Sequence, residues 1–313
     1  MKLSLFDLHC DTAFMMHRHR QPLMRNDFAI SLENARKFEQ YVQVMAIWTD
    51  PNLSDADGWQ AFGDILRTLK EDASVQHHEA ELIDEIPLEP IRKPSLLLAV
   101  EDARILCGDA SRLEHLYQNG VRILTPLWKG KTSIGGSHDT KEGLTPFGKT
   151  AIFDAMKLGM LIDISHASVA SAEEIFSCAE SLALPVIATH SNAYELCSAS
   201  RNLHRAQAIK ILKSGGVVGL NLYPPFLKKD GIAHVEDVVD HAEYFLDLGF
   251  EDHLCLGCDM DGADMPPEVQ NLSVLDRLAN AMLSRRFSER LVQKIFFENA
   301  RRFFQHYVNK KIT

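Results

Sequence analysis

The stretch Gly-Met-Leu-Ile-Asp-Ile-Ser-His, residues 159–166, is a short apolar run that ends on a potential metal ligand, His166. The same pattern recurs along the chain. It places side chains that can bind a metal or transfer a proton at the carboxyl ends of the apolar runs. These are His9, Asp11, Glu101, His166, His190 and Asp259. Parallel strands that each deliver a polar group at the same end build an active site there. We therefore expect these six side chains to converge.

The apolar runs also predict the fold. Runs of strand length lie at residues 3–8, 41–48, 95–100, 121–127, 160–164, 185–189, 216–222 and 253–257. They are nearly continuous in apolar character, as expected for strands that are buried on both faces. Helical patterns lie between and after them, at residues 31–40, 56–82, 111–119, 146–158, 169–182, 205–213, 235–248, 273–283 and 288–307. This alternation predicts a (β/α)8 TIM barrel with additional C-terminal helices, formed as a single domain by residues 1–313.

The connecting segments agree with this order. Gly120, Gly159, Gly215 and Gly249 each follow a helical pattern, where a left-handed cap suits glycine. Residues 50–94 read as a helical excursion plus a loop. Residues 128–145 read as a loop on the catalytic side of the barrel, where they form a wall or a lid.

Composition narrows the choice of partner and compartment. The 313 residues carry a formal net charge of -10, which repels phosphate backbones and argues against nucleic acid. A polar His-x-Asp at residues 9–11 stands where a secretory signal would need its apolar region, so we expect no such signal. No run reaches the length of a membrane span. Six scattered cysteines are typical of free thiols in a reducing compartment. We expect a cytoplasmic protein that does not bind a membrane.

The polar residues at the strand ends favour a metal centre. His9 and Asp11 are two positions apart, so that in a strand both side chains point the same way and can bind one cation. Glu101 is either a ligand or a cap for the next helix, and His166 or His190 taken alone would more often be a buried core histidine. Five such groups at one level make these alternatives much less attractive.

Five ligands that include one bridging carboxylate can hold two divalent ions, as in hydrolytic two-metal sites. The mixture of imidazole and carboxylate donors favours zinc, and cobalt or manganese would fit the same donors. A water shared by the two ions would be the nucleophile. Asp259 follows the eighth run and is placed to transfer a proton to a leaving group, although Asp261, two residues later, competes for this role.

Several segments together resemble the membrane (renal) dipeptidase family, peptidase family M19, within the amidohydrolase barrels. The likeness runs from about Phe6 to about Phe304. The segments that carry it are Asp-Leu-His-Cys-Asp-Thr (7–12), Gly-Leu-Thr-Pro-Phe-Gly (143–148), Gly-Met-Leu-Ile-Asp-Ile-Ser-His (159–166), Thr-His-Ser-Asn-Ala (189–193), Ser-Arg-Asn-Leu (200–203) and Gly-Cys-Asp-Met-Asp-Gly (257–262).

The resemblance implies a role for each of these positions. It implies that His9, Asp11 and Glu101 hold one zinc ion, that Glu101 bridges to the second, and that His166 and His190 complete that second site. It also implies that Arg201 pairs with the terminal carboxylate of the substrate, for which a guanidinium is suited, and that Asp259 is the acid/base. The resemblance suggests a homodimer, which no feature of the sequence itself requires.

The chain departs from the family at one position. Members typically have a substrate-binding histidine after the fourth strand, in a Leu-Thr-His type of segment. Here Val-Arg-Ile-Leu-Thr-Pro-Leu-Trp, residues 121–128, puts Leu127 or Trp128 in that place. His138, further along the loop, either substitutes for the missing imidazole or is a surface residue. We therefore consider Trp128 and His138 with Arg201 as candidate substrate-binding residues.

The expected function is that of a metallodipeptidase. It would be a binuclear zinc hydrolase that cleaves the amide bond of dipeptides with a metal-bridged hydroxide, including dipeptides with a D-residue at the C-terminal position. One alternative keeps the metal chemistry but acts on a non-peptide amide, lactam or lactone, because the family histidine is missing. A second alternative is a barrel that binds metal or a partner without catalysis.

Overall fold

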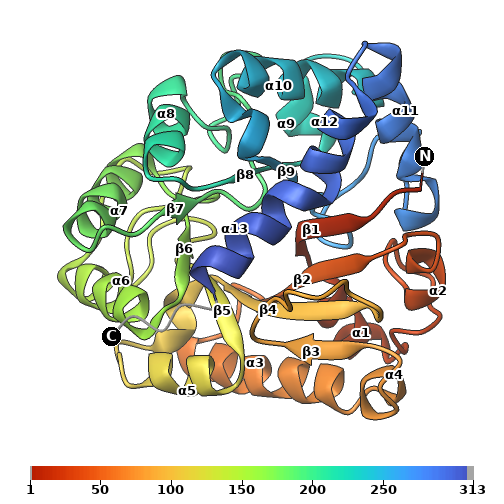
Figure 1. Cartoon of the computed structure of the whole chain (residues 1–313). Coiled ribbons are helices and arrows are strands. Elements are labelled where there is room, and N and C mark those ends of the chain that lie inside the picture. Colours follow the sequence, from red (N-terminus) through yellow and green to blue (C-terminus); the bar gives the residue numbers. More distant parts are fainter. Residues whose placement is uncertain (1, 309–313) are drawn as a thin grey trace.

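A computed structural model describes residues 2–308 and contains nine β-strands (Figure 1). The strands are β1 (Leu5–Cys10), β2 (Tyr41–Trp48), β3 (Glu81–Ile83), β4 (Ser95–Glu101), β5 (Val121–Thr125), β6 (Leu161–Asp163), β7 (Val186–Ile187), β8 (Val218–Leu220) and β9 (Leu254–Leu256). Eight of them match the eight apolar runs of the sequence. Their residues are buried throughout, apart from Trp48, as expected for strands covered on both faces.

These eight strands form a parallel barrel. Their order is β7-β6-β5-β4-β2-β1-β9-β8, and each pair of neighbours in this order is parallel. An isolated parallel bridge between Ala188 and Val218 connects the two ends of this path and closes the ring. The predicted (β/α)8 barrel is confirmed.

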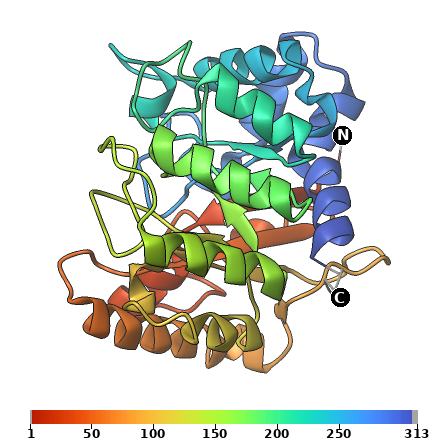
Figure 2. The same cartoon turned by 90° about the vertical axis from the view of Figure 1, so that its left-hand side faces the viewer.

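Helices follow the strands on the outside. They are α1 (Thr12–His19), α2 (Leu32–Ala35), α3 (Asp55–Lys70), α4 (Ala73–Gln76), α5 (Arg112–Gln118), α6 (Pro146–Leu158), α7 (Val169–Ser181), α8 (Arg205–Lys213), α9 (Pro224–Leu227), α10 (Val235–Asp247), α11 (Asp276–Ser284), α12 (Glu289–Gln293) and α13 (Asn299–Tyr307). Short 3-10 turns lie at Ala103–Leu106, Phe250–Asp252 and Leu272–Val274, and a π-helical turn at Lys294–Glu298 joins α12 to α13. Three successive helices, α6, α7 and α8, lie side by side on the outer surface (Figures 1 and 2).

The C-terminal helix closes one end of the barrel. Phe297, Phe303 and Phe304 pack in one buried cluster with inward residues of the strands, and the ring of Phe304 lies 5.1 Å from that of Phe6 in β1. Phe6 is near the amino end of its strand, so α13 covers the amino ends of the strands (Figure 1). The carboxyl ends, where the polar residues lie, are left for the site.

Some local predictions were wrong. Residues 81–83, predicted at the end of a helix, form β3, which pairs in parallel with β4 beside the barrel. The helix predicted at 31–40 is only the single turn α2, the helix predicted at 56–82 is divided into α3 and α4, and helices α1 and α9 were not predicted. The four glycines predicted to be left-handed all have positive φ, and Gly159, at 92°, is the C-cap of α6.

Within residues 2–308, no helix combines the length and the hydropathy needed to cross a bilayer.

Candidate active site

Five predicted ligands meet at the carboxyl ends of the barrel strands. His9 lies in β1, Glu101 is the last residue of β4, and His166 and His190 follow β6 and β7. His9 Nε2 lies 3.6 Å from a carboxylate oxygen of Asp11 and 3.6 Å from Oε2 of Glu101. Glu101 Oε1 lies 2.9 Å from His166 Nε2 and 3.5 Å from His190 Nε2. One carboxylate thus faces all three imidazoles.

The local backbone is shaped to bring these groups close together. Asp259 and Asp261 have φ values of 64° and 68°, a conformation that short polar side chains tolerate better than most. The turn that they form passes directly over Asp11. A Cβ atom on Gly262 would lie 2.0 Å from Asp11 Oδ2, so a larger residue there would displace the Asp11 carboxylate.

The hydrogen bonds of the two later histidines orient their rings toward Glu101. His166 Nδ1 donates to the carbonyl oxygen of Trp128 at 3.0 Å, and His190 Nδ1 lies 2.7 Å from the hydroxyl oxygen of Thr189. A neutral ring that carries its proton on Nδ1 presents a lone pair at Nε2. The two Nε2 atoms are only 3.0 Å apart, so both lone pairs are directed at one small region.

The donor set fits a divalent cation. His9 Nε2, Asp11 Oδ1 and Glu101 Oε1 are buried and have no hydrogen-bond partner. An unpartnered buried polar atom is costly unless an ion or water satisfies it. Ligand atoms of His9, Glu101 and His190 lie within 4.8 Å of one another, and so do those of His9, Asp11 and Asp259. These two overlapping groups share His9 and offer the imidazole and carboxylate donors that divalent transition metals accept.

The electrostatics of the metal-free cluster depend on Glu101. Burial alone would raise its pKa, but His9 and His166 hold that pKa well below its usual range. Burial would lower the pKa of His9, but Glu101 and Asp11 hold it well above its usual value. Burial and the nearby His9 lower the pKa of His190 well below its ordinary value. The cluster therefore contains an ionised carboxylate beside a neutral His190.

Asp259 and Asp261 occupy different environments. Asp259 Oδ2 accepts a hydrogen bond from Asn221 Nδ2 at 2.9 Å, while Oδ1 lies 3.9 Å from His9 Nε2. Burial raises the pKa of Asp259 to about 7, with Asp11 and Glu101 adding to the rise and His9 opposing it. The oxygens of Asp261 accept hydrogen bonds from Thr12 Oγ1 and from backbone amides of residues 29 and 30. Asp261 therefore has a structural role, because its oxygens are hydrogen-bonded to Thr12 and to the backbone of residues 29 and 30. Asp259 is the carboxyl group that faces the donor cluster.

Arg201 is a buried cation beside this cluster. Its side chain donates from Nη1 to Ser191 Oγ and from Nη2 to the His190 carbonyl, both at 3.0 Å, and its residue exposure is 3%. Its Nε has no partner, and among residues 2–308 no acidic side chain forms an ion pair with it. Burial lowers its pKa to about 10. A guanidinium with free donors in such a place is suited to an anionic ligand.

Trp128 and His138 lie near His166. The Trp128 ring is 6.4 Å from that of His166 and makes an edge contact, at 5.2 Å, with Trp48. His138 is half-buried, its ring is 5.9 Å from that of His166, and its Nδ1 lies 2.9 Å from Ser200 Oγ. Burial, with His166 and Arg201 nearby, lowers the pKa of His138 to about 4. The loop at residues 128–145 thus forms a wall of the candidate site.

Sequence reasoning missed residues that hold these groups in place. Asn221, which bonds Asp259, directly follows β8 and is a polar residue inside the apolar run 216–222, the same signal that identified Glu101. Asp163 is the last residue of β6, and it accepts hydrogen bonds from Thr125 and Thr189. The sequence can mark such a position, but it does not reveal the partners of these residues, which come from other strands.

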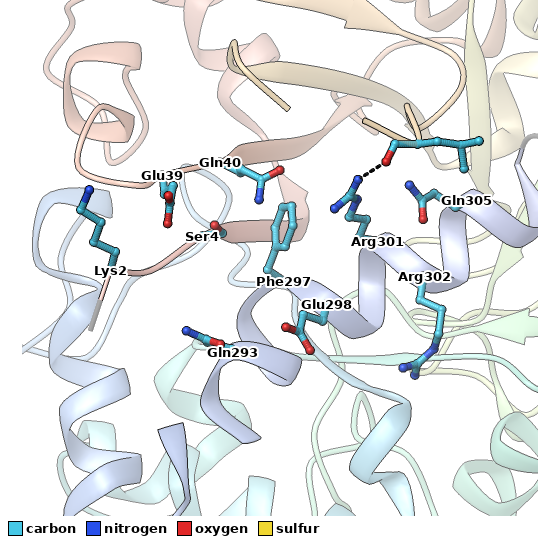
Figure 3. A pocket seen from close by; sticks show the side chains of 11 residues that line it. Lys2, Ser4, Glu39, Gln40, Gln293, Phe297, Glu298, Arg301, Arg302 and Gln305 are labelled. Atoms are coloured by element: carbon cyan, nitrogen blue, oxygen red, sulfur yellow. Dashed lines mark hydrogen bonds between the residues drawn. The ribbon is translucent and has the colours of Figure 1, made fainter. Parts of the chain in front are cut away.

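A cavity of about 600 Å³ lies elsewhere, at the amino ends of the strands (Figure 3). It is lined by Lys2, Ser4, Glu39, Gln40, Leu88, Gln293, Phe297, Glu298, Arg301, Arg302 and Gln305. Arg301 donates to the carbonyl oxygen of Leu88, which also lines the cavity, at 2.7 Å (Figure 3). None of the candidate site residues lines this cavity.

Comparison with known proteins identifies a family. The family model described as "Membrane dipeptidase (Peptidase family M19)" matches residues 1–312. A protein from Klebsiella pneumoniae, described as an uncharacterized protein in the pqqA 5' region, is 33% identical over 66% of this chain and 79% of its own length. The dipeptidase tcpJ of Claviceps purpurea is 34% identical over 66% of this chain and 49% of its own length. The match therefore spans only about half of some curated relatives.

A solved structure agrees with the fold. The metallo peptidase from Rhodobacter sphaeroides, crystallised with a phosphinate mimic of the dipeptide L-Ala-D-Ala, is similar with a TM-score of 0.88 and 23% identity. The similarity covers 98% of this chain and 100% of that one. At this level of identity the likeness establishes the barrel architecture.

Proposed function

The chain belongs to the membrane dipeptidase family, peptidase family M19, a family of metal-dependent hydrolases, and we propose that it is a binuclear zinc dipeptidase. We propose that His9, Asp11 and Glu101 hold one ion, and that Glu101, His166 and His190 hold the other. The observation that carries this proposal is the set of buried, unpartnered donor atoms around Glu101. Zinc is our choice because imidazole and carboxylate donors together suit it.

The chemistry of the site divides between the cations and the protein. When bound, two divalent cations supply Lewis acidity and a nucleophilic water at neutral pH. Asp259 moves the proton: because Asn221 donates to Oδ2, the proton resides on Oδ1, the oxygen nearer His9. A carboxyl group in this position can accept a proton and return it to a leaving amine.

The substrate class follows from Arg201. We propose that its free Nε and remaining Nη hydrogens bind the terminal carboxylate of a dipeptide. Trp128 and His138, which lie near His166, would contact the rest of the substrate. The Rhodobacter neighbour was crystallised with a mimic of L-Ala-D-Ala, and for this reason we include dipeptides with a C-terminal D-residue among the proposed substrates.

A second candidate keeps the metal chemistry but changes the substrate. Where the family has its substrate-binding histidine, this chain has a cluster of three aromatic side chains. The ring centroid of Trp128 lies 5.2 Å from that of Trp48, and the centroid of Trp48 lies 4.9 Å from that of Phe14. Such a wall offers apolar contact where the family offers a hydrogen bond. This feature favours a cyclic, less polar amide, lactam or lactone.

A substrate screen separates these functions. We expect the zinc-loaded chain to cleave L,L- or L,D-dipeptides, and to lose about 10²-fold or more in kcat/KM on the matching dipeptide C-terminal amides, because Arg201 then stays buried and unpaired. Hydrolysis products are measured by chromatography. Turnover of lactams without turnover of any dipeptide would reverse the ranking. A chain that binds zinc but hydrolyses none of these compounds would favour the non-catalytic alternative.

Two further properties stay predictions. All six cysteines are free thiols, which supports the cytoplasmic location that we propose. The homodimer is suggested only by the family resemblance.

A further inference from the structure

Asp163 is a fully buried carboxylate behind the donor cluster. Its Oδ1 accepts hydrogen bonds from the Ser165 amide at 2.9 Å, from Ser165 Oγ at 2.6 Å and from the Thr189 amide at 2.9 Å. Its Oδ2 accepts from Thr125 Oγ1 at 2.7 Å and from Thr189 Oγ1 at 2.5 Å. Its exposure is 0%, and none of the roles proposed for the hydrolytic site uses it. All five of these groups are N–H or O–H donors, so both oxygens of Asp163 act as acceptors.

The hydrogen-bond pattern around Asp163 determines where the Thr189 hydrogen lies. A carboxylate has no hydrogen to donate, so in the contact with Asp163 Oδ2 the Thr189 hydroxyl is the donor. A hydroxyl has only one hydrogen. Toward His190 Nδ1, 2.7 Å away, the Thr189 oxygen can therefore only accept, and Nδ1 must carry the proton of the neutral ring.

This proton position matters at the other end of the ring. With Nδ1 protonated, His190 Nε2 presents its lone pair toward Glu101 Oε1 at 3.5 Å and toward His166 Nε2 at 3.0 Å. The carbonyl of Trp128 imposes the same tautomer on His166. A histidine with the opposite tautomer would point an N–H at the cluster and could not bind a cation there.

We propose that Asp163 and Thr189 form a relay that fixes the Nδ1–H tautomer of His190 and thereby sets the affinity of the site for a divalent metal. Asp163 and Thr189 are positioning residues, since they act through His190. The metal-affinity part rests on the proposed function, because it takes His190 as a ligand. The tautomer part depends only on the protein.

The competing role is purely structural. Asp163 also accepts backbone amides of Ser165 and Thr189, and it holds the segments that follow β6 and β7 together. A structural role predicts that any disturbance of Thr189 would act through loss of stability. The relay predicts instead that only loss of the hydroxyl matters.

A matched pair of variants tests this difference. Thr189→Val keeps the shape of the side chain but removes the hydroxyl, whereas Thr189→Ser keeps it. We expect Thr189→Val to weaken Zn²⁺ binding about 10- to 100-fold, measured on the full chain by competition with a chromophoric chelator, and Thr189→Ser to bind within about threefold of the parent chain. Equal affinities for Thr189→Val and the parent chain, or equal losses in both variants, would overturn the relay.

A second readout observes the proton directly. In the metal-free chain labelled with ¹⁵N-histidine, the His190 signals are assigned by their absence in His190→Gln. We expect the shift of Nε2 to be that of an unprotonated nitrogen. In Asp163→Asn the introduced amide donates to Thr189 Oγ1 and frees its hydrogen for His190 Nδ1, so the ring proton should move to Nε2. An unchanged tautomer in a folded Asp163→Asn chain would contradict the relay.

These readouts are independent of hydrolysis. If the tautomer behaves as stated but no dipeptide is cleaved, the relay stands and the proposed function fails. If dipeptides are cleaved while Thr189→Val binds Zn²⁺ like the parent chain, the proposed function stands and the relay fails.

Discussion

Glu101→Gln is expected to lower dipeptide turnover by about 10³-fold or more, because it removes the one carboxylate that faces every imidazole of the cluster. Glu101 Oε1 lies near His166 and His190, and Oε2 lies near His9. Glutamine has the same shape, but it replaces one oxygen by an N–H₂ donor and removes the negative charge. It can neither bridge two cations nor balance their charge.

Metal content should fall together with activity in this variant. Elemental analysis after dialysis should find at most one zinc ion for each chain of Glu101→Gln. The matched control is Glu114→Gln on α5, where the side chain is exposed and accepts only from Gln118. That control should retain the metal content and turnover of the parent chain. Full metal content with near-parent activity in Glu101→Gln would show that this carboxylate does not bridge.

Asp259→Asn is expected to lower kcat about 10²- to 10⁴-fold while zinc remains bound, because general acid–base catalysis contributes about that much. Asparagine keeps the size of the side chain and tolerates the φ of 64° at this position, but it cannot carry the transferred proton. The control is Asp264→Asn, an exposed residue of the same loop, which should leave kcat unchanged. Equal kcat values for Asp259→Asn and the parent chain would rule out Asp259 as the acid/base.

Although Asp259→Asn should lower kcat, it should raise the folding stability of the metal-free protein. Burial raises the pKa of Asp259 from 3.8 to about 7, so the folded chain binds this proton more tightly than the unfolded chain. The resulting stability is complete below about pH 4 and is lost as the pH rises through about 7. At pH 8 the metal-free Asp259→Asn chain should therefore be more stable than its parent, by about 2 to 4 kcal/mol in urea denaturation. If Asp259→Asn were instead less stable than its parent at pH 8, the ionised form of Asp259 would not destabilise the folded chain.

The strands of the barrel could be predicted because buried strands consist mostly of apolar residues. Both faces of β2 and β4 are covered, so their residues form apolar runs that are easily recognised. Strand β3 lacks this signal, because its three residues are exposed or half-buried and it pairs beside the barrel. The predicted helix at 31–40 was too long, because the helical turn α2 ends at Ala35 and the chain then enters β2 at Tyr41.

The ligands could be predicted for a related reason. A histidine or carboxylate that ends an apolar run must lie where parallel strands end, and His9, Glu101 and His190 do. Arg201 carries no such signal and was found only through the family resemblance. The partners of Asp163 and Asn221 lie on strands distant in the sequence, so their contacts required the folded structure.

The most direct test of the account is a crystal structure of the zinc-loaded chain, with anomalous diffraction measured at the zinc absorption edge. Two peaks should lie about 3.5 to 4 Å apart with the Glu101 carboxylate between them, one peak beside His9 and the other beside His166 and His190. A single peak, or peaks that do not contact Glu101, would contradict the account.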